Sequence, residues 1–141
     1  MFSKILVPVD GSDVSYRALD AALFFSEKMG SIVTVVHFIE NVPTVYIESQ
    51  KILDELLNAH RDEGKKILDK CLEIAERKGI MINTNLLQGS PGSSILEFAD
   101  EGNFDAITIG SHGKGGFKEM LLGSVSSKIV HHFLQPVLLI K

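Results

Sequence analysis

Cysteine is nearly missing from this sequence, and so is any excess of positive charge. Cys71 is the only cysteine among 141 residues, so no disulfide can form within the chain. Lys and Arg number 14 against 18 Asp and Glu, which leaves a net charge of −4. This balance argues against a general nucleic-acid binder, because such proteins usually carry a basic surface. It still allows one small anion to bind, since a helix N-terminus attracts phosphate even in an acidic protein.

Long apolar runs are also missing. No stretch approaches the roughly 20 residues that a membrane-spanning helix needs, so we expect no membrane contact. The segment from Ile5 to Val9 is too short for a signal peptide and leads directly into Asp10. We therefore expect a cytoplasmic location. Residues 1–141 are expected to form a single domain with an ordinary core.

The apolar pattern alternates between short β-branched segments and longer segments with helical spacing. The short segments predict strands at residues 4–9, 31–38, 80–87, 105–109 and 137–140. The longer segments predict helices at residues 12–29, 48–78, 90–102 and 124–134. Gly64 interrupts the second helix, where a bend or close packing is expected. On the same helix, Cys71 is interpreted as a small core residue, with a reactive thiol as the alternative.

The order βαβαβαβαβ predicts an α/β fold with a five-stranded parallel sheet, helices on both faces and right-handed crossovers, which is a Rossmann-like architecture. In such a sheet, ligands bind beyond the carboxyl ends of the strands, where the strand order reverses. Pro8 cannot donate to a β ladder, so its place near the end of the first strand indicates that pairing stops there. Polar and glycine residues follow four of the expected strands, which predicts a binding site at this edge: Asp10–Gly11, His37–Phe38, Gln88–Gly89 and Gly110–Ser111.

The most unusual segment is Gly110–Ser126, which reads GSHGKGGFKEMLLGSVS. Gly110 and Gly113 follow the fourth strand, and without a Cβ they let main-chain N–H groups approach a ligand closely. The helix that begins after Gly123 offers unpaired N–H groups and its positive dipole end to a phosphate. The alternative is a flexible surface loop that is capped by serine and holds no ligand.

Two common phosphate-binding motifs are absent from this chain. It contains no G-x-x-x-x-G-K-[ST], which excludes a Walker-type P-loop. Gly113-Lys114-Gly115 begins like the dinucleotide pattern G-x-G-x-x-G, but Lys118 stands where the last glycine is required. A phosphate-binding role for this segment therefore needs a different pattern.

The spacing of the glycines resembles the nucleotide-binding signature of the universal stress protein family. The signature is Gly110-x-x-Gly113, nine further residues and then Gly123-Ser124. The stretch from Lys4 to Ser12 resembles the first strand and turn of that family, and Gln135 to Ile140 resembles its last strand. The resemblance covers the whole chain, and it is to the ATP-binding subgroup. It implies an adenine-nucleotide-binding α/β domain of the adenine nucleotide alpha hydrolase-like type, usually a homodimer.

The resemblance also implies a role for individual residues. Pro8 and Asp10 would contact ribose and adenine, and His37 and Phe38 would line the base pocket. The phosphates would be held by Gly110, His112, Gly113, Lys114, Gly123, Ser124, Val125 and Ser126. ATP is the expected ligand, with ADP and AMP as alternatives. No residue is expected to bind a metal directly, but Mg²⁺ would arrive with ATP near Asp10 and Ser124.

Structural explanations exist for several of these residues. Asp10 can serve as a turn or capping aspartate in Asp10-Gly11-Ser12. His37 can be a hydrogen-bonded structural residue, and Phe38 can belong to the core. Lys114 can be a solvated loop lysine.

We expect a regulatory binding module in which ATP changes the shape, the dimer or the choice of partner. A slow ATP hydrolase or another nucleotide-processing enzyme is the alternative, with His112 and Asp10 as its candidate residues. A phosphorelay receiver is set aside because the third strand ends at Leu87-Gln88 without an aspartate. The last strand, residues 137–140, is expected at an open sheet edge, where it would pair with a second copy in a homodimer.

Overall fold

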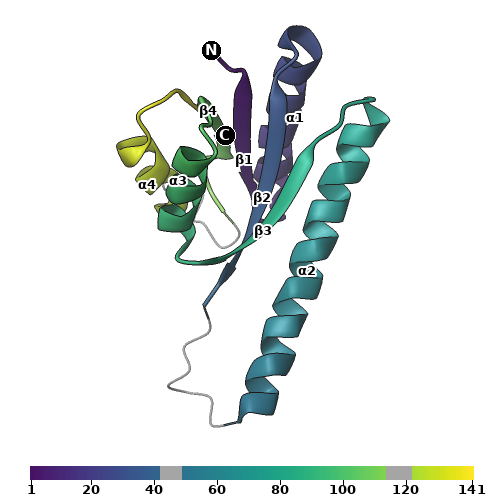
Figure 1. Cartoon of the computed structure of the whole chain (residues 1–141), viewed down its shortest axis with the longest axis vertical. Coiled ribbons are helices and arrows are strands. Elements are labelled where there is room, and N and C mark those ends of the chain that lie inside the picture. The colour runs from purple at the N-terminus through teal and green to yellow at the C-terminus, as the bar shows by residue number, and fades with distance from the viewer. Residues whose placement is uncertain (42–48, 114–121) are drawn as a thin grey trace.

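The computed structural model describes residues 1–41, 49–113 and 122–141. Strands and helices alternate along the chain, which confirms the predicted order (Figure 1). The elements are β1 (Lys4–Val9), α1 (Asp13–Met29), β2 (Ile32–Glu40), α2 (Gln50–Arg77), β3 (Asn83–Gly89), α3 (Pro91–Glu101), β4 (Ala106–Gly110), α4 (Ser124–His132) and β5 (Val137–Ile140).

The five strands form one parallel sheet in the order β3-β2-β1-β4-β5. The chain runs outward from β1 through β2 to β3 and then returns to add β4 on the other side of β1. The strand order therefore reverses between β1 and β4. In a parallel α/β sheet this is the place where the loops diverge and a crevice forms.

Pro8 explains why β1 and β4 separate toward this crevice. β1 pairs with β2 along its whole length, from Lys4 to Val9, but its pairing with β4 covers only Ile5 and Leu6. Beyond Leu6, Pro8 has no N–H to offer to a ladder. The expectation that pairing stops near Pro8 is thus confirmed on the β4 side, while the β2 side stays paired.

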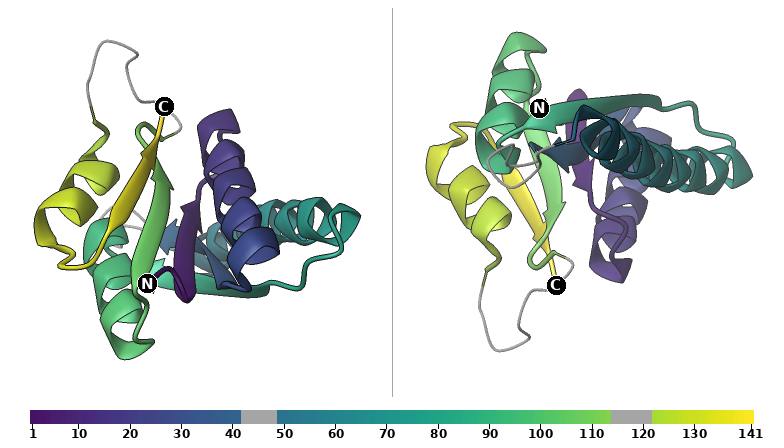
Figure 2. Two further views of the ribbon diagram at one scale, coloured as in Figure 1. Left: turned by 90° about the horizontal axis from the view of Figure 1, so that it is seen from above. Right: turned by 90° about the horizontal axis from the view of Figure 1, so that it is seen from below.

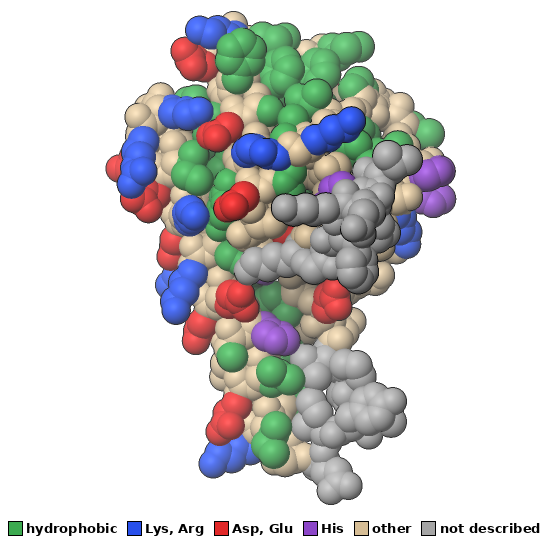
Figure 3. Space-filling model, turned by 180° about the vertical axis from the view of Figure 1, so that it is seen from behind, with side chains coloured by type: hydrophobic (Ala, Val, Ile, Leu, Met, Phe, Trp, Pro, Cys, Tyr) green, Lys and Arg blue, Asp and Glu red, His purple; other side chains and the backbone are tan. Residues whose placement is uncertain are grey.

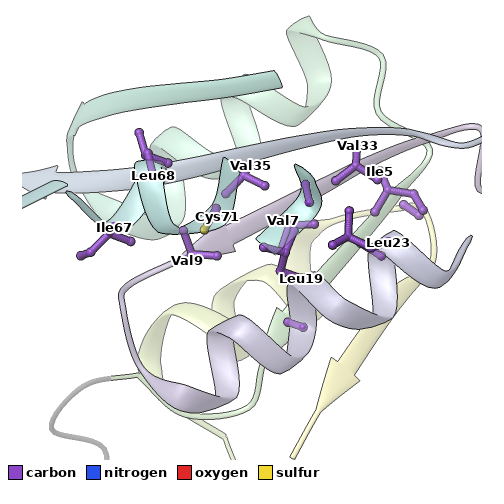
Figure 4. Close-up of a cluster of buried hydrophobic side chains, with 14 residues drawn as sticks. Ile5, Val7, Val9, Leu19, Leu23, Val33, Val35, Ile67, Leu68 and Cys71 are labelled. Atoms are coloured by element: carbon purple, nitrogen blue, oxygen red, sulfur yellow. The ribbon is translucent and has the colours of Figure 1, made fainter. Parts of the chain in front are cut away.

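Helices cover both faces of the sheet, as Figure 2 shows. α1 and α2 pack on one face over a cluster that includes Leu19, Leu23 and Leu68 (Figure 4). Cys71 is fully buried in this cluster, and burial raises the pKa of its thiol to about 12. This confirms Cys71 as a core residue and leaves no thiolate for reaction at neutral pH. On the other face, α3 and α4 contribute Ile95, Ala99 and Ile129, and Phe133, which follows α4, joins them.

α1 shows how local sequence sets the ends of an element. The hydroxyl of Ser12 accepts a hydrogen bond from the N–H of Ser15 (3.3 Å), which caps the first turn. At the other end Gly30 takes φ 74°, and its N–H donates to Ser26 O (2.9 Å). That conformation is strained for residues with a Cβ, so the glycine ends the helix there.

α2 lies very close to the sheet at Gly64. A Cβ at this position would be 2.8 Å from His37 Cδ2 on β2 and 2.8 Å from Leu86 Cδ1 on β3. The expectation of close packing at Gly64 is confirmed. Only the second half of α2 is buried, from Gly64 to Ala75, and the first half extends beyond the carboxyl ends of the strands (Figure 1).

β3 begins later than expected. The prediction placed its start at residue 80, whereas the strand runs from Asn83 to Gly89. Ile80 and Ile82 caused the error, because these two apolar residues resemble a strand in sequence. In the structure they pack against the α1–α2 core before the pairing of Asn83 with Thr34 begins.

Candidate functional site

A cavity of about 640 Å³ lies at the carboxyl ends of β1, β2 and β4, where the strand order reverses. Nearly all of the residues predicted from the sequence line it: Pro8, Asp10, His37, Phe38, Gly110, His112, Gly113, Gly123, Ser124, Val125 and Ser126. Lys114 lies outside the described residues. Residues from four separate parts of the sequence therefore meet around one space.

The amino end of α4 presents main-chain donors to this cavity. Gly123 is the N-cap, and its own N–H donates to Ser111 O (2.6 Å). The N–H of Ser127 donates to Gly123 O (2.9 Å), which begins the helical hydrogen bonding. Among the described residues, the N–H groups of Ser124, Val125 and Ser126 have no acceptor. Three donors and the positive end of the helix dipole thus meet at a place suited to an anion.

Ser126 fixes the start of α4 against the end of β4. Its buried hydroxyl donates to Ser111 O (2.9 Å) and also lies 3.1 Å from Gly123 O. Because a hydroxyl has one proton, this proton is already engaged within the chain. The group that Ser126 can still donate is its main-chain N–H. Its side chain orients the helix start on which that N–H lies.

Asp10 connects the turn after β1 with the glycine loop. Its Oδ1 accepts hydrogen bonds from the N–H of Ser12 (2.9 Å) and from the Ser12 hydroxyl. Its Oδ2 lies only 2.7 Å from where a Cβ on Gly113 would be. Asp10 is therefore a turn aspartate that also lines the cavity. Its role in the turn is thus compatible with the expected contact with a ligand. Gly113 is required because a side chain there would collide with the carboxylate.

His37 hydrogen bonds to the main chain of the neighbouring strand. Its Nδ1 lies 2.8 Å from Val9 O, the carbonyl of the last residue of β1. A carbonyl can only accept, so Nδ1 carries the proton and donates. This matches the structural explanation considered for His37. Phe38, the next residue, faces the opposite side of the sheet and packs against the α3–α4 core as well as lining the cavity.

Sequence reasoning missed one wall of the cavity. α2 contributes His60, Glu63 and Ile67, and the end of β2 contributes Glu40. Helical spacing shows which face of α2 is apolar, but it does not show that the helix extends past the sheet. The only signal in the sequence was Gly64. A glycine within a helix can mark a place where the helix lies close to the sheet, and the helical residues beside it, here His60 and Glu63, then lie near the ends of the strands. The other lining residues that were missed are Val9, Ser15, Val36, Ile39, Pro91, Ile95 and Ile109.

The charged side chains that line the described part of the cavity are all carboxylates: Asp10, Glu40 and Glu63. Figure 3 shows acidic side chains and a histidine close together midway along one face of the molecule. Within the described ranges, no group of three or more His, Cys, Asp or Glu is placed to hold a metal ion. The attraction for an anion in this part of the site therefore comes from main-chain N–H groups.

Comparison with known proteins identifies the family. A family model described as the universal stress protein family matches residues 1–141. The chain belongs to the universal stress protein family. The universal stress protein YxiE of Bacillus subtilis is 38% identical over 149 residues, which cover 100% of both chains.

Solved structures agree with the family and the fold. This universal stress protein is similar to MJ0577 of Methanocaldococcus jannaschii, with a TM-score of 0.87, 30% identity and coverage of 100% of this chain and 96% of that one. It is also similar to a universal stress protein of Archaeoglobus fulgidus solved in complex with dAMP. That pair has a TM-score of 0.70 and 27% identity, and each chain is fully covered. In the described parts of the chain, no helix is both long and apolar enough to cross a bilayer.

Proposed function

We propose that this universal stress protein binds an adenine nucleotide, with ATP as its main ligand, and acts as a nucleotide-dependent regulatory module in the cytoplasm. The observation that carries the proposal is the set of three N–H donors of Ser124, Val125 and Ser126 beside the cavity. Phosphate is the ligand group best matched to such a helix terminus. The dAMP complex of the Archaeoglobus fulgidus relative supports an adenine nucleotide as the ligand.

The order of the strands suggests how the nucleotide lies. Neighbouring strands are about 4.8 Å apart, so β4 and β2, which flank β1, are separated by roughly 10 Å. The phosphates would lie at β4 and the start of α4, and the ribose would lie over the end of β1 beside Asp10. The base would then reach the end of β2, where Phe38 offers an aromatic face and Pro91 and Ile95 supply apolar walls.

Mg²⁺ fits this arrangement as part of the nucleotide. Bound Mg²⁺ would neutralise phosphate charge, and Asp10 and the Ser124 hydroxyl are the oxygen groups that would support it from the protein. Mg²⁺ usually keeps several waters and uses few protein ligands when phosphates are present. This requirement agrees with a cavity in which carboxylates are few and spread over different elements.

We also propose that the protein forms a homodimer through β5. This strand is at one edge of the sheet, and its residues Val137–Ile140 are only half buried in the single chain. An apolar edge strand of this kind is a natural place for a second copy to pair. Small-angle scattering at micromolar concentration tests this point, and a monomeric mass would contradict it.

Nucleotide binding is tested by identifying what the protein carries and what it takes up. The purified protein is denatured, any released nucleotide is identified, and ATP is titrated against the wild type and Gly113→Val. The variant is expected to bind ATP much more weakly, because its side chain would collide with the Asp10 carboxylate. Equal ATP affinity in both proteins would overturn the assignment of this loop.

A further inference from the structure

We propose that His37 is a positioning residue for the nucleotide site, which it serves by holding the end of β1 so that Asp10 faces the cavity. This inference rests on the proposed nucleotide binding and adds to it a second task for a residue that also lines the cavity. The resemblance to the family implied that His37 lines the base pocket. The geometry assigns it a further task.

The imidazole of His37 is held on two sides. On one side Nδ1 donates to Val9 O over 2.8 Å. On the other side the ring lies against α2 at Gly64, where a Cβ would be 2.8 Å from Cδ2 and 3.4 Å from Nε2. A larger residue than glycine at this point of α2 would push the ring away from Val9. The absence of a side chain at Gly64 thus leaves room for the ring in its hydrogen-bonded position.

The carbonyl of Val9 belongs to the peptide bond that leads into Asp10. A peptide unit is planar, so a hydrogen bond that fixes its carbonyl also fixes the direction in which the next residue leaves the strand. Near Val9, strand pairing holds β1 from the β2 side alone, because its pairing with β4 covers only Ile5 and Leu6. His37, the register partner of Val9, adds a side-chain hydrogen bond to the pairing there.

The Asp10 carboxylate can move little without losing a contact or making a collision. Its Oδ1 accepts two hydrogen bonds from Ser12, and its Oδ2 is close to Gly113 in the glycine loop. A rotation of the peptide before Asp10 would move the carboxylate either into Gly113 or away from Ser12. Both movements would misplace the group proposed to meet the ribose and Mg²⁺. His37 therefore affects the ligand site through Val9 and Asp10.

Two substitutions of His37 separate the hydrogen bond from the volume of the ring. Asn places an amide N–H near the position of Nδ1, so His37→Asn keeps a donor for Val9 O. Leu fills similar space without a donor, so His37→Leu removes the hydrogen bond. Leu86→Ala is the matched control, because Leu86 packs at the same point of α2 but does not line the cavity.

ATP affinity is measured by titration, and stability is measured by urea unfolding. We expect His37→Leu to weaken ATP binding about tenfold and His37→Asn to stay within about threefold of the wild type, which is the range of one hydrogen bond. Leu86→Ala should lower the urea midpoint only slightly, because the Leu86 side chain is 39% exposed, and its ATP affinity should stay within about threefold. The proposal is overturned by unchanged affinity in His37→Leu, by equal losses in both His37 variants, or by an equal affinity loss in Leu86→Ala.

A measurement without nucleotide separates this inference from the proposed function. Amide exchange by NMR follows the N–H of Ser12, which donates to Asp10. It should be protected in the wild type, His37→Asn and Leu86→Ala, and unprotected in His37→Leu. Long-range ¹H–¹⁵N spectra of the wild type should show the proton of His37 on Nδ1, and a proton on Nε2 alone would refute the hydrogen bond. If the wild type binds no nucleotide but Ser12 responds in this way, the proposed function fails and the positioning role stands.

Discussion

The substitution Ser124→Pro tests the anion-binding end of α4 with little effect on the fold. Ser124 is the first helical residue, and Gly123 before it has φ −71° and ψ 167°. Proline is favoured at the first helical position, and the residue before proline prefers this extended conformation. The stability of the protein should therefore change by less than about 1 kcal/mol. Pro91 occupies the corresponding position at the start of α3, so the chain already contains one such arrangement.

The effect on binding should be much larger than the effect on stability. Proline removes one of the three main-chain donors, and a hydrogen bond to a charged group contributes about 1.5–3 kcal/mol. The Kd for ATP should thus rise roughly 10- to 150-fold. Ser124→Ala is the matched control, since it keeps the N–H and loses only the hydroxyl, and its Kd should stay within about threefold.

Isothermal titration with ATP in the absence of Mg²⁺ measures the two Kd values, so that the role proposed for the Ser124 hydroxyl toward Mg²⁺ does not enter the comparison. Thermal unfolding verifies that both variants are folded. A Ser124→Pro protein that unfolds like the wild type and binds ATP with the same Kd would refute the reasoning. So would an equal loss of affinity in Ser124→Ala, because the hydroxyl would then carry the interaction that we assign to the main chain.

Three further predictions concern stability and reactivity. Gly64→Ala should lower the free energy of unfolding, measured in urea, by about 1 kcal/mol. Overpacking costs about 1–3 kcal/mol, while the better helix propensity of alanine returns only about 1 kcal/mol. A more stable variant would contradict the close packing. Burial raises the pKa of the Asp105 carboxyl, but the N–H groups of Lys4 and Ser3 that donate to it lower the pKa below its ordinary 3.8 overall. The ionised Asp105 carboxylate therefore stabilises the fold at neutral pH, and this contribution is lost as the pH falls through the pKa of the folded state. In urea unfolding, the stability difference between the wild type and Asp105→Asn should shrink from pH 7 to pH 3. Cys71 should react with a thiol reagent only after unfolding, and rapid stoichiometric labelling of the native protein at pH 8 would show that it is not buried.

The order of the elements was predictable because it depends on local patterns. β-branched runs, helical spacing and caps such as Ser12 and Gly30 act within a few residues of the chain. β3 shows where this fails: Ile80 and Ile82 have the composition of a strand, but the core that buries them lies on other elements. The start of β3 is set by its pairing with β2. This pairing joins residues that are far apart in the sequence, so a short stretch of sequence does not reveal it.

The glycine segment of the site was also predictable, because its residues lie close together in the sequence. The wall made by His60 and Glu63 was not, since it depends on how far α2 extends past the sheet. The partner of His37 was hidden for a similar reason. Val9 O belongs to the main chain of another strand, and its hydrogen bond depends on the register between β1 and β2. Sequence spacing carries no information on that register.

The reversal of strand order also affects how the protein must be made. β1 is the first strand of the chain, yet it receives β4 only after most of the sequence exists, and Ser3 contacts Asp105 across 102 residues. Closing so long a loop is entropically costly and slow compared with forming α1 or α2 alone. On a ribosome, β1, α1 and β2 can assemble before the glycine loop has emerged. The ligand cavity is then one of the last features to appear, so nucleotide can stabilise only chains in which β4 and α4 have already been made and have folded onto the sheet.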